Sequence, residues 1–64
     1  MPTITVEGPR IEVEKKRQLV KRLTDAASEV YGIDRKHIIV LIRENLPENV
    51  GVGGELLADR RGSA

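Results

Sequence analysis

Proline at the second position is the residue of this sequence with the most distinctive chemistry. It directly follows Met1, and a small second residue such as proline normally permits removal of the initiator methionine. The exposed group would be a secondary amine, mostly protonated at neutral pH because α-amino groups titrate at about 7.7 to 8.0. By strand parity Pro2 lies on the apolar side with Ile4 and Val6, where desolvation disfavours the ammonium form and a nearby arginine would lower the pKa further. Pro2 is therefore a candidate general base, beside the plainer interpretation of a proline that only starts a strand.

A glycine-rich stretch, GVGG at positions 51–54, has the composition of a loop that could cradle a phosphate. It does not follow a clear strand and open a helix, and it lacks both the G-x-G-x-x-G spacing and the lysine of a P-loop. Gly51, Gly53 and Gly54 instead suit a tight turn, because glycine permits positive φ. We predict a turn or hairpin here.

Basic residues cluster between positions 15 and 22, in the runs KKR and KR. Most of them fall opposite the apolar positions of the same segment, beside Asp25 and Glu29, and no aromatic side chain stands among them for base stacking. This pattern predicts a solvated helix face rather than a nucleic-acid surface. His37 has no cysteine or second histidine to bind a metal with, so we interpret it as a surface residue.

Three segments must position these side chains. TITVE at 3–7 alternates polar and apolar residues, which predicts a half-buried strand. From about Val13 to Tyr31 the apolar residues recur at helical spacing within an arc of roughly 120°, and Gly32 is placed to end the helix. HIIVLIRE at 37–44 predicts a second strand. This order predicts an α/β fold built on one β-α-β unit, with parallel strands and a right-handed connection. The predicted sheet-facing positions of the helix are Leu19, Val20, Leu23, Ala26, Ala27 and Val30.

The second strand indicates that the chain associates with copies of itself. The five consecutive apolar residues at 38–42 lack the alternation of a sheet with one wet face, so we expect both faces to be covered. One helix covers only one of them. A chain of 64 residues with no cysteine and one histidine also lacks the disulfides or metal site that stabilise small cores. We therefore expect an obligate homo-oligomer in which another subunit covers this strand.

The charge and hydropathy of the chain argue against a nucleic-acid or membrane partner. Eleven basic and ten acidic residues give a formal charge of +1, too little for the attraction on which nucleic-acid binding depends. The longest apolar run, IIVLI, is far shorter than the ~20 residues of a membrane-spanning helix. No segment has the pattern of a signal peptide. We expect a single soluble, cytoplasmic domain over residues 1–64, with no nucleic-acid or membrane partner.

Several motifs together resemble the 4-oxalocrotonate tautomerase family of the tautomerase superfamily. They are Pro2 behind Met1, EG at 7–8 followed by Arg10, the helix EKKRQLVKRLTDAASEVYG, the strand IIVLIRE and the late GVGGE. The resemblance covers nearly the whole chain. It implies a β-α-β protomer with a short C-terminal hairpin or turn, pairs of which form a four-stranded sheet, and three such dimers forming a hexamer.

The resemblance also implies an activity, the keto-enol tautomerisation of a 2-hydroxydienoate or related 2-keto acid without any cofactor. Pro2 would be the general base that takes a proton and returns it at a distant carbon. Arg10 would bind a carboxylate or the developing enolate oxygen. The implied partner is a small anionic organic acid.

Two positions depart from the family's pattern. Ile39 stands in place of a second active-site arginine, and Val50 in place of the aromatic residue before the glycine turn. Arg43 shares the strand parity of Ile39 but lies roughly 13 Å further along at ~3.3 Å per residue. Arg43, acting from a different geometry or subunit, and Arg61 near the C-terminus are therefore further substrate-binding candidates. The departures favour a smaller or monocarboxylate substrate, or else a non-enzymatic oligomeric scaffold that kept the fold.

Overall fold

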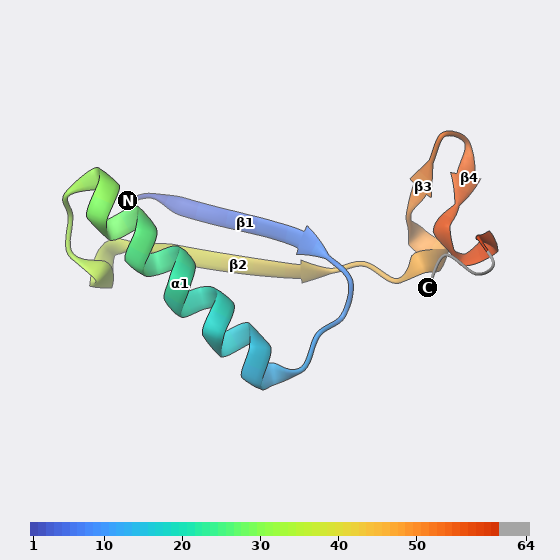
Figure 1. Ribbon diagram of the computed structural model, residues 1–64. Helices are drawn as coiled ribbons and strands as arrows, with labels where there is room; N and C mark the ends of the chain where they lie inside the picture. Colours follow the sequence, from blue (N-terminus) through green and yellow to red (C-terminus); the bar gives the residue numbers. More distant parts are fainter. Residues whose placement is uncertain (61–64) are drawn as a thin grey trace.

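The computed structural model describes residues 1–60. Its central feature is a pair of parallel strands, β1 (Thr3–Gly8) and β2 (Ile39–Glu44), in register from Thr3 opposite Ile39 to Gly8 opposite Glu44. Figure 1 shows the two strands side by side, with helix α1 (Val13–Tyr31) crossing one face of them. The predicted β-α-β unit with parallel strands is confirmed.

Helix α1 has the bounds expected from the sequence, and Gly32 ends it. Gly32 has a φ of 70°, in the left-handed region that favours glycine, and its N–H donates to the Ser28 carbonyl at 2.9 Å. The Ser28 hydroxyl donates to the Ile33 carbonyl at 2.5 Å. These bonds stop the helix and turn the chain back toward β2.

The second strand begins two residues later than the sequence predicted. A short 3₁₀ turn occupies Arg35–His37, because the Asp34 carboxylate accepts the Lys36 N–H at 3.0 Å and caps the turn. His37 is therefore an exposed turn residue that precedes the strand, and β2 starts at Ile39.

The sheet covers fewer apolar positions of α1 than the sequence pattern predicted. Leu19, Leu23 and Ala27 are half-buried, whereas Val20 and Val30 are 36% and 85% exposed. At 100° per residue Val30 falls between Leu19 and Leu23 but lies in the last turn of α1, so its exposure depends on its position along the helix. The exposed part of this apolar surface has no cover within one protomer.

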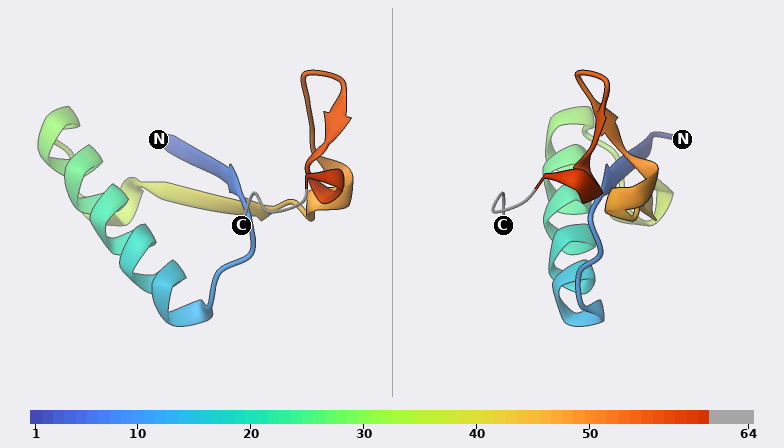
Figure 2. Two further views of the ribbon diagram at one scale, coloured as in Figure 1. Left: turned by 45° about the vertical axis from the view of Figure 1, so that its right-hand side comes forward. Right: turned by 90° about the vertical axis from the view of Figure 1, so that its right-hand side faces the viewer.

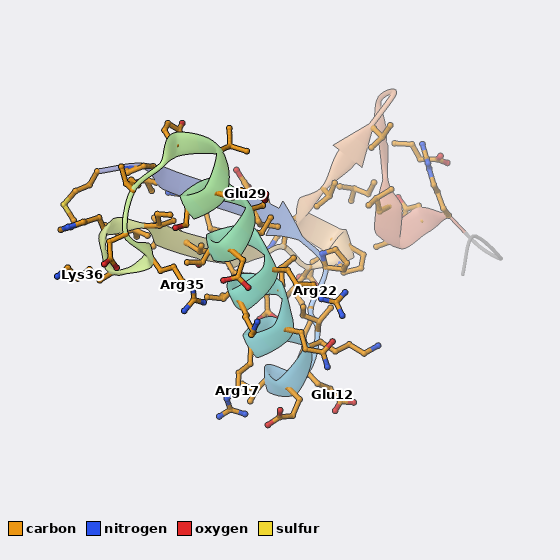
Figure 3. The ribbon with its side chains drawn as sticks, turned by 60° about the vertical axis from the view of Figure 1, so that its left-hand side comes forward. Glu12, Arg17, Arg22, Glu29, Arg35 and Lys36 are labelled. Atoms are coloured by element: carbon orange, nitrogen blue, oxygen red, sulfur yellow. The ribbon has the colours of Figure 1, made fainter. Side chains whose placement is uncertain are left out.

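Lys16 corrects the expectation of a solvated basic face. Its side chain is only 30% exposed, and its Nζ forms an ion pair with Glu44 Oε2 at 2.8 Å. At 100° per residue Lys16 falls on the same side of α1 as Leu23 and Ala27, so it lies over the sheet. The other residues of the two basic runs are exposed, as predicted; Figure 3 shows Arg17 projecting away from the sheet. With these charges along α1, no helix within residues 1–60 is long and apolar enough to cross a membrane.

The face of the sheet opposite α1 is uncovered. Strand alternation places Ile39, Leu41 and Arg43 there, and Ile39 and Leu41 are 41% and 45% exposed. Figure 2 shows from two further sides that α1 lies on one side of the strands. No apolar side chain in the described part of the chain is buried. The protomer therefore has no closed core of its own.

The GVGG stretch forms the predicted hairpin. β3 (Gly51–Val52) and β4 (Glu55–Leu56) pair antiparallel, and the turn residues Gly53 and Gly54 have φ of 63° and 85°. Positive φ at both central positions of a two-residue turn favours glycine at each. Two 3₁₀ turns flank the hairpin, at Pro47–Asn49 and Leu57–Asp59. Figure 1 shows the hairpin beyond the ends of β1 and β2, away from the N-terminus.

Candidate active site

Pro2 is held at the start of β1 by its own backbone. Its carbonyl accepts the Ile39 N–H at 3.1 Å, and the residue is half-buried. The missing N–H of proline does no harm here, because the strand ladder uses the carbonyl. Met1 is 82% exposed and acylates the Pro2 nitrogen in the full chain. Removal of Met1 would therefore expose a secondary amine at a fixed position.

Arg10 lies at the other end of β1, in the loop 9–12 that leads to α1. Its side chain is exposed and makes no ion pair or hydrogen bond within residues 1–60. The next residue is anchored, because the Ile11 N–H donates to Glu44 Oε2 at 3.1 Å. The Arg10 guanidinium is thus carried by an attached loop and is free to bind an anion.

One protomer does not bring Pro2 and Arg10 together. From Thr3 to Gly8 the strand β1 is roughly 16 Å long at ~3.3 Å per residue, and the two residues lie beyond its opposite ends. In Figure 1 the N-terminus lies near the C-terminal end of α1, whereas the loop after β1 enters the N-terminal end. Within one protomer the two side chains are too far apart to act on one small substrate.

Ile39 and Arg43 lie at opposite ends of the uncovered face of β2. Ile39 is beside Pro2, to which its backbone is bonded, and Arg43 pairs in register with Glu7. Glu7 Oε1 accepts a hydrogen bond from Asn45 Nδ2 at 3.2 Å, and Arg43 has no ion pair among the described residues. Arg43 therefore presents a free cation at the end of the sheet remote from Pro2.

A cleft of about 610 Å³ lies at that remote end, where the sheet meets the hairpin. Its lining mixes apolar and polar residues and includes Glu7, Pro9, Asn45, Pro47, Val50 and Leu57. Because Pro9 lines it, the cleft adjoins the loop that carries Arg10. Val50 is half-buried and supplies part of the apolar wall. Arg61, the last predicted substrate-binding residue, lies outside the described residues.

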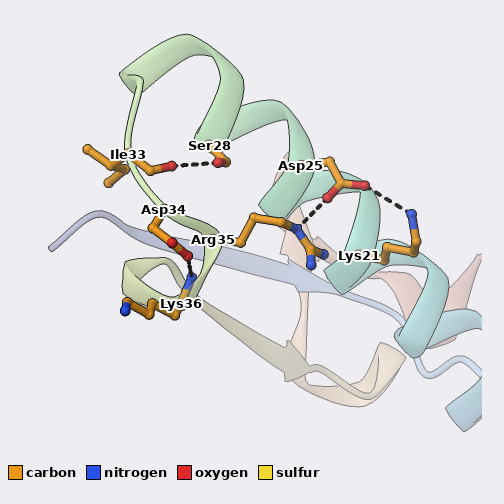
Figure 4. A network of polar contacts seen from close by, with 7 residues as sticks. All are labelled: Lys21, Asp25, Ser28, Ile33, Asp34, Arg35 and Lys36. Atoms are coloured by element: carbon orange, nitrogen blue, oxygen red, sulfur yellow. Dashed lines mark hydrogen bonds and ion pairs between the residues drawn. The ribbon is translucent and has the colours of Figure 1, made fainter.

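Three cations on or beside the outer side of α1 are paired with carboxylates. Figure 4 shows Asp25 between Lys21 and Arg35, with Lys21 Nζ at 3.0 Å from Oδ2 and Arg35 Nε at 2.6 Å from Oδ1. The Lys21 hydrogen bond is the main reason that the pKa of Asp25 is lowered from its ordinary 3.8. Arg17 is paired with Glu14 in the same way. These pairs support the predicted solvated face.

His37 and the acidic residues do not form a metal centre. No group of three or more His, Cys, Asp or Glu side chains in the part of the chain that the structure describes could hold a metal ion.

Glu44 is the residue of this region that the sequence reasoning missed. It alternates with Val40 and Ile42 onto the face that α1 covers, so its carboxylate faces the helix. The hydrogen bond from Lys16, followed by that from the Ile11 N–H, lowers the pKa of Glu44 from its ordinary 4.5. Strand parity along β2, combined with the position of Lys16 on the sheet side of α1, is the signal from which this pair can be found.

Comparisons with known proteins agree with this architecture. The sequence matches the family model described as "Tautomerase enzyme" over residues 2–60. The 2-hydroxymuconate tautomerase of Bacillus subtilis strain 168 is 39% identical over 62 residues, which cover 92% of this chain and 97% of that protein. The crystal structure of DmpI from Archaeoglobus fulgidus is 55% identical with a TM-score of 0.85, and the match covers 91% of this chain and 100% of that one. YwhB, a homologue of 4-oxalocrotonate tautomerase, is 33% identical with a TM-score of 0.87, over 92% and 98% of the two chains.

Fold and relatives together define a small isomerase of the β-α-β type. The chain belongs to the tautomerase family. The resemblance to 4-oxalocrotonate tautomerase seen in the sequence is thereby confirmed.

Replacement of Lys16 by alanine is expected to raise the pKa of Glu44 toward 4.5, because the Lys16 hydrogen bond is the largest cause that lowers it. A lowered folded-state pKa adds stability that is complete above the unfolded value and is lost as the pH falls through the folded pKa. The wild-type protein should therefore lose this contribution only below about pH 4.5, and Lys16→Ala should have less of it to lose. NMR titration of the side-chain carboxyl carbons measures the pKa directly.

The matched control is Lys15→Ala, which removes an exposed lysine without an ion pair among residues 1–60. It should leave the Glu44 titration unchanged. A Glu44 pKa that is the same in wild type and Lys16→Ala would contradict the assignment of the pair.

Proposed function

We propose that the protein is a cofactor-independent keto-enol tautomerase acting on a small 2-hydroxydienoate or 2-keto acid. Its general acid and base is the Pro2 amine, freed by removal of Met1. The position of Pro2 carries this proposal, because its carbonyl is bonded to the Ile39 N–H and fixes the nitrogen at the start of β1. Membership of the tautomerase family and the name of the Bacillus subtilis relative, 2-hydroxymuconate tautomerase, support it.

The proposed step moves one proton and leaves the composition of the substrate unchanged. The neutral Pro2 nitrogen accepts a proton from the enol hydroxyl or from carbon, and the resulting ammonium returns it at a distant carbon. α-Amino groups ordinarily titrate near 8, and partial desolvation favours the neutral amine. A guanidinium beside the site, for which Arg10 is the candidate, further disfavours the ammonium and binds the substrate carboxylate or enolate oxygen.

We further propose that the working site is assembled between protomers of a homo-oligomer, with a hexamer as the expected form. Pro2 and Arg10 lie beyond opposite ends of β1, so only a second protomer can place them on one substrate. Ile39 and Leu41 expose apolar surface on the face that α1 leaves open. Burial of such surface, at roughly 25 cal/mol per Å², is the available driving force for association.

The departures at Ile39 and Val50 bear on the substrate. Because Ile39 stands where the family's pattern has an arginine, the site lacks one cation, which suits a smaller or monocarboxylate acid. Arg43, free and exposed, remains our candidate for a second cation supplied by a neighbouring protomer. The same departures favour the scaffold alternative, but membership of an enzyme family favours catalysis.

Substitution of Pro2 is the first test. Intact mass establishes that Met1 is absent, and the ketonisation of 2-hydroxymuconate and of an arylpyruvate enol is then followed by absorbance. Wild type is expected to turn over at least one of them, and Pro2→Ala should lose nearly all of this rate because it replaces the secondary amine with a primary amine of different basicity and geometry. Equal rates in the two proteins would defeat the mechanism, and no rate in fully processed wild type would favour the scaffold.

Arg10→Ala is expected to lower kcat/KM by about 10² or more, the loss that follows removal of one oxyanion donor. Arg22→Ala is its matched control, since Arg22 is exposed on α1 and has no ion pair in the described chain. Steady-state kinetics on the better of the two substrates measure both. An Arg10→Ala enzyme with the kcat/KM of wild type would remove Arg10 from the site.

Leu41→Lys is expected to break the assembly, because it places a charge on apolar surface that a second protomer covers. Light scattering after size-exclusion chromatography should show a smaller species than wild type, and activity should fall with the loss of assembly. Glu29→Lys introduces a lysine at an exposed position of α1 and should change neither property. A Leu41→Lys protein with the mass of the wild-type assembly would contradict this use of the uncovered face.

A further inference from the structure

The loop 9–12 carries Arg10 and has few bonds of its own. Pro9 has no N–H, and the Ile11 N–H makes the only hydrogen bond that this loop donates within residues 1–60. The acceptor is Glu44 Oε2, 33 positions further along the chain, at the end of β2. Among the described residues, Glu44 is thus the one side chain that hydrogen-bonds this loop to the sheet.

The strands place Glu44 where it can make this bond. Gly8, the last residue of β1, is opposite Glu44, and the Asn45 N–H donates to the Gly8 carbonyl at 2.9 Å. The backbone is therefore fixed just before Arg10 by the strand ladder and just after it, at Ile11, by the Glu44 carboxylate. Arg10 lies between two anchored points.

Lys16, and not Arg10, forms the ion pair with the Glu44 carboxylate. Its Nζ lies 2.8 Å from Glu44 Oε2, the same oxygen that accepts the Ile11 N–H. Arg10 is close enough for its charge to contribute to the lowered pKa of Glu44, yet it forms no ion pair with it. Glu44 therefore holds the backbone beside Arg10, and Lys16 neutralises the charge of the Glu44 carboxylate. The Arg10 guanidinium consequently stays free for an anionic substrate.

We propose that Glu44 is a positioning residue for Arg10, acting through the Ile11 backbone, in the tautomerase reaction proposed above, on which this role rests. It does not touch the substrate. It limits the places that the guanidinium can occupy before the substrate arrives, and such preorganisation contributes to rate because a displacement of about 1 Å is costly at a reacting centre.

A double-mutant cycle with Arg10 tests this role. Glu44→Ala is expected to lower kcat/KM about tenfold in the wild-type background, since Arg10 is still present but no longer held. In the Arg10→Ala background the same change should lower kcat/KM by less than about twofold, because no guanidinium remains to be positioned. A merely structural loss would be the same in both backgrounds, and that result would overturn the proposal.

Two further variants complete the experiment. Glu44→Gln keeps an oxygen that can accept the Ile11 N–H, so it should stay within about threefold of wild type. Glu48→Ala removes an exposed carboxylate from the nearby turn Pro47–Asn49 and should leave kcat/KM unchanged. If light scattering shows that Glu44→Ala does not assemble, Glu44→Leu, which keeps the bulk of the side chain but cannot accept the Ile11 N–H, carries the cycle in its place. A loss of kcat/KM in Glu44→Leu that is the same with and without Arg10 overturns the role.

The Pro2→Ala variant separates this proposal from the proposed function. A Pro2→Ala protein as active as wild type refutes the function itself. A Pro2→Ala protein that has lost its activity, together with a Glu44→Ala protein equal to wild type, refutes the positioning role alone.

Discussion

The hydrogen-bonded ladder between β1 and β2 fixes the backbone at the two places that carry the proposed reacting groups, Pro2 and the loop of Arg10. At one end the Ile39 N–H holds the carbonyl of Pro2, and at the other the Asn45 N–H holds the carbonyl of Gly8, immediately before the loop of Arg10. The strands are paired in register between these two bonds, so one continuous ladder joins them. A rigid strand roughly 16 Å long therefore keeps the two proposed reacting groups apart in each protomer.

The narrowness of this sheet has a second consequence. Two strands cover only part of α1 on one face and leave Ile39 and Leu41 open on the other, so no apolar side chain among residues 1–60 is buried. In the proposed assembly, the same shortage of cover that disfavours a folded monomer favours a second protomer on the uncovered face. Association and assembly of a complete site thus have one physical origin in this account.

Much of the fold follows from local patterns in the sequence. The period of the apolar residues, together with Gly32, was enough to predict both ends of α1. Gly53 and Gly54 predicted the turn because glycine readily adopts the positive φ that both residues have in the structure. The start of β2 was predicted two residues too early. A single capping residue, Asp34, is a weaker sequence signal for a 3₁₀ turn than the apolar run that follows is for a strand. The site was less predictable. In the sequence Lys16 cannot be told apart from the exposed lysines of the same run, because its burial depends on the sheet that packs against α1. The hydrogen bond between Glu44 and Ile11 joins residues 33 positions apart, which no local pattern predicts.

Mixing of two inactive variants tests whether one active site takes Pro2 and Arg10 from two different protomers. Pro2→Ala and Arg10→Ala chains are unfolded and refolded together, and the activity of the mixture is compared with that of each variant refolded alone. If one site takes Pro2 from one protomer and Arg10 from another, some sites in mixed oligomers contain both native residues, and the mixture should regain a substantial part of the wild-type rate. A mixture of confirmed mixed oligomers that is no more active than the mean of the two variants would contradict the account.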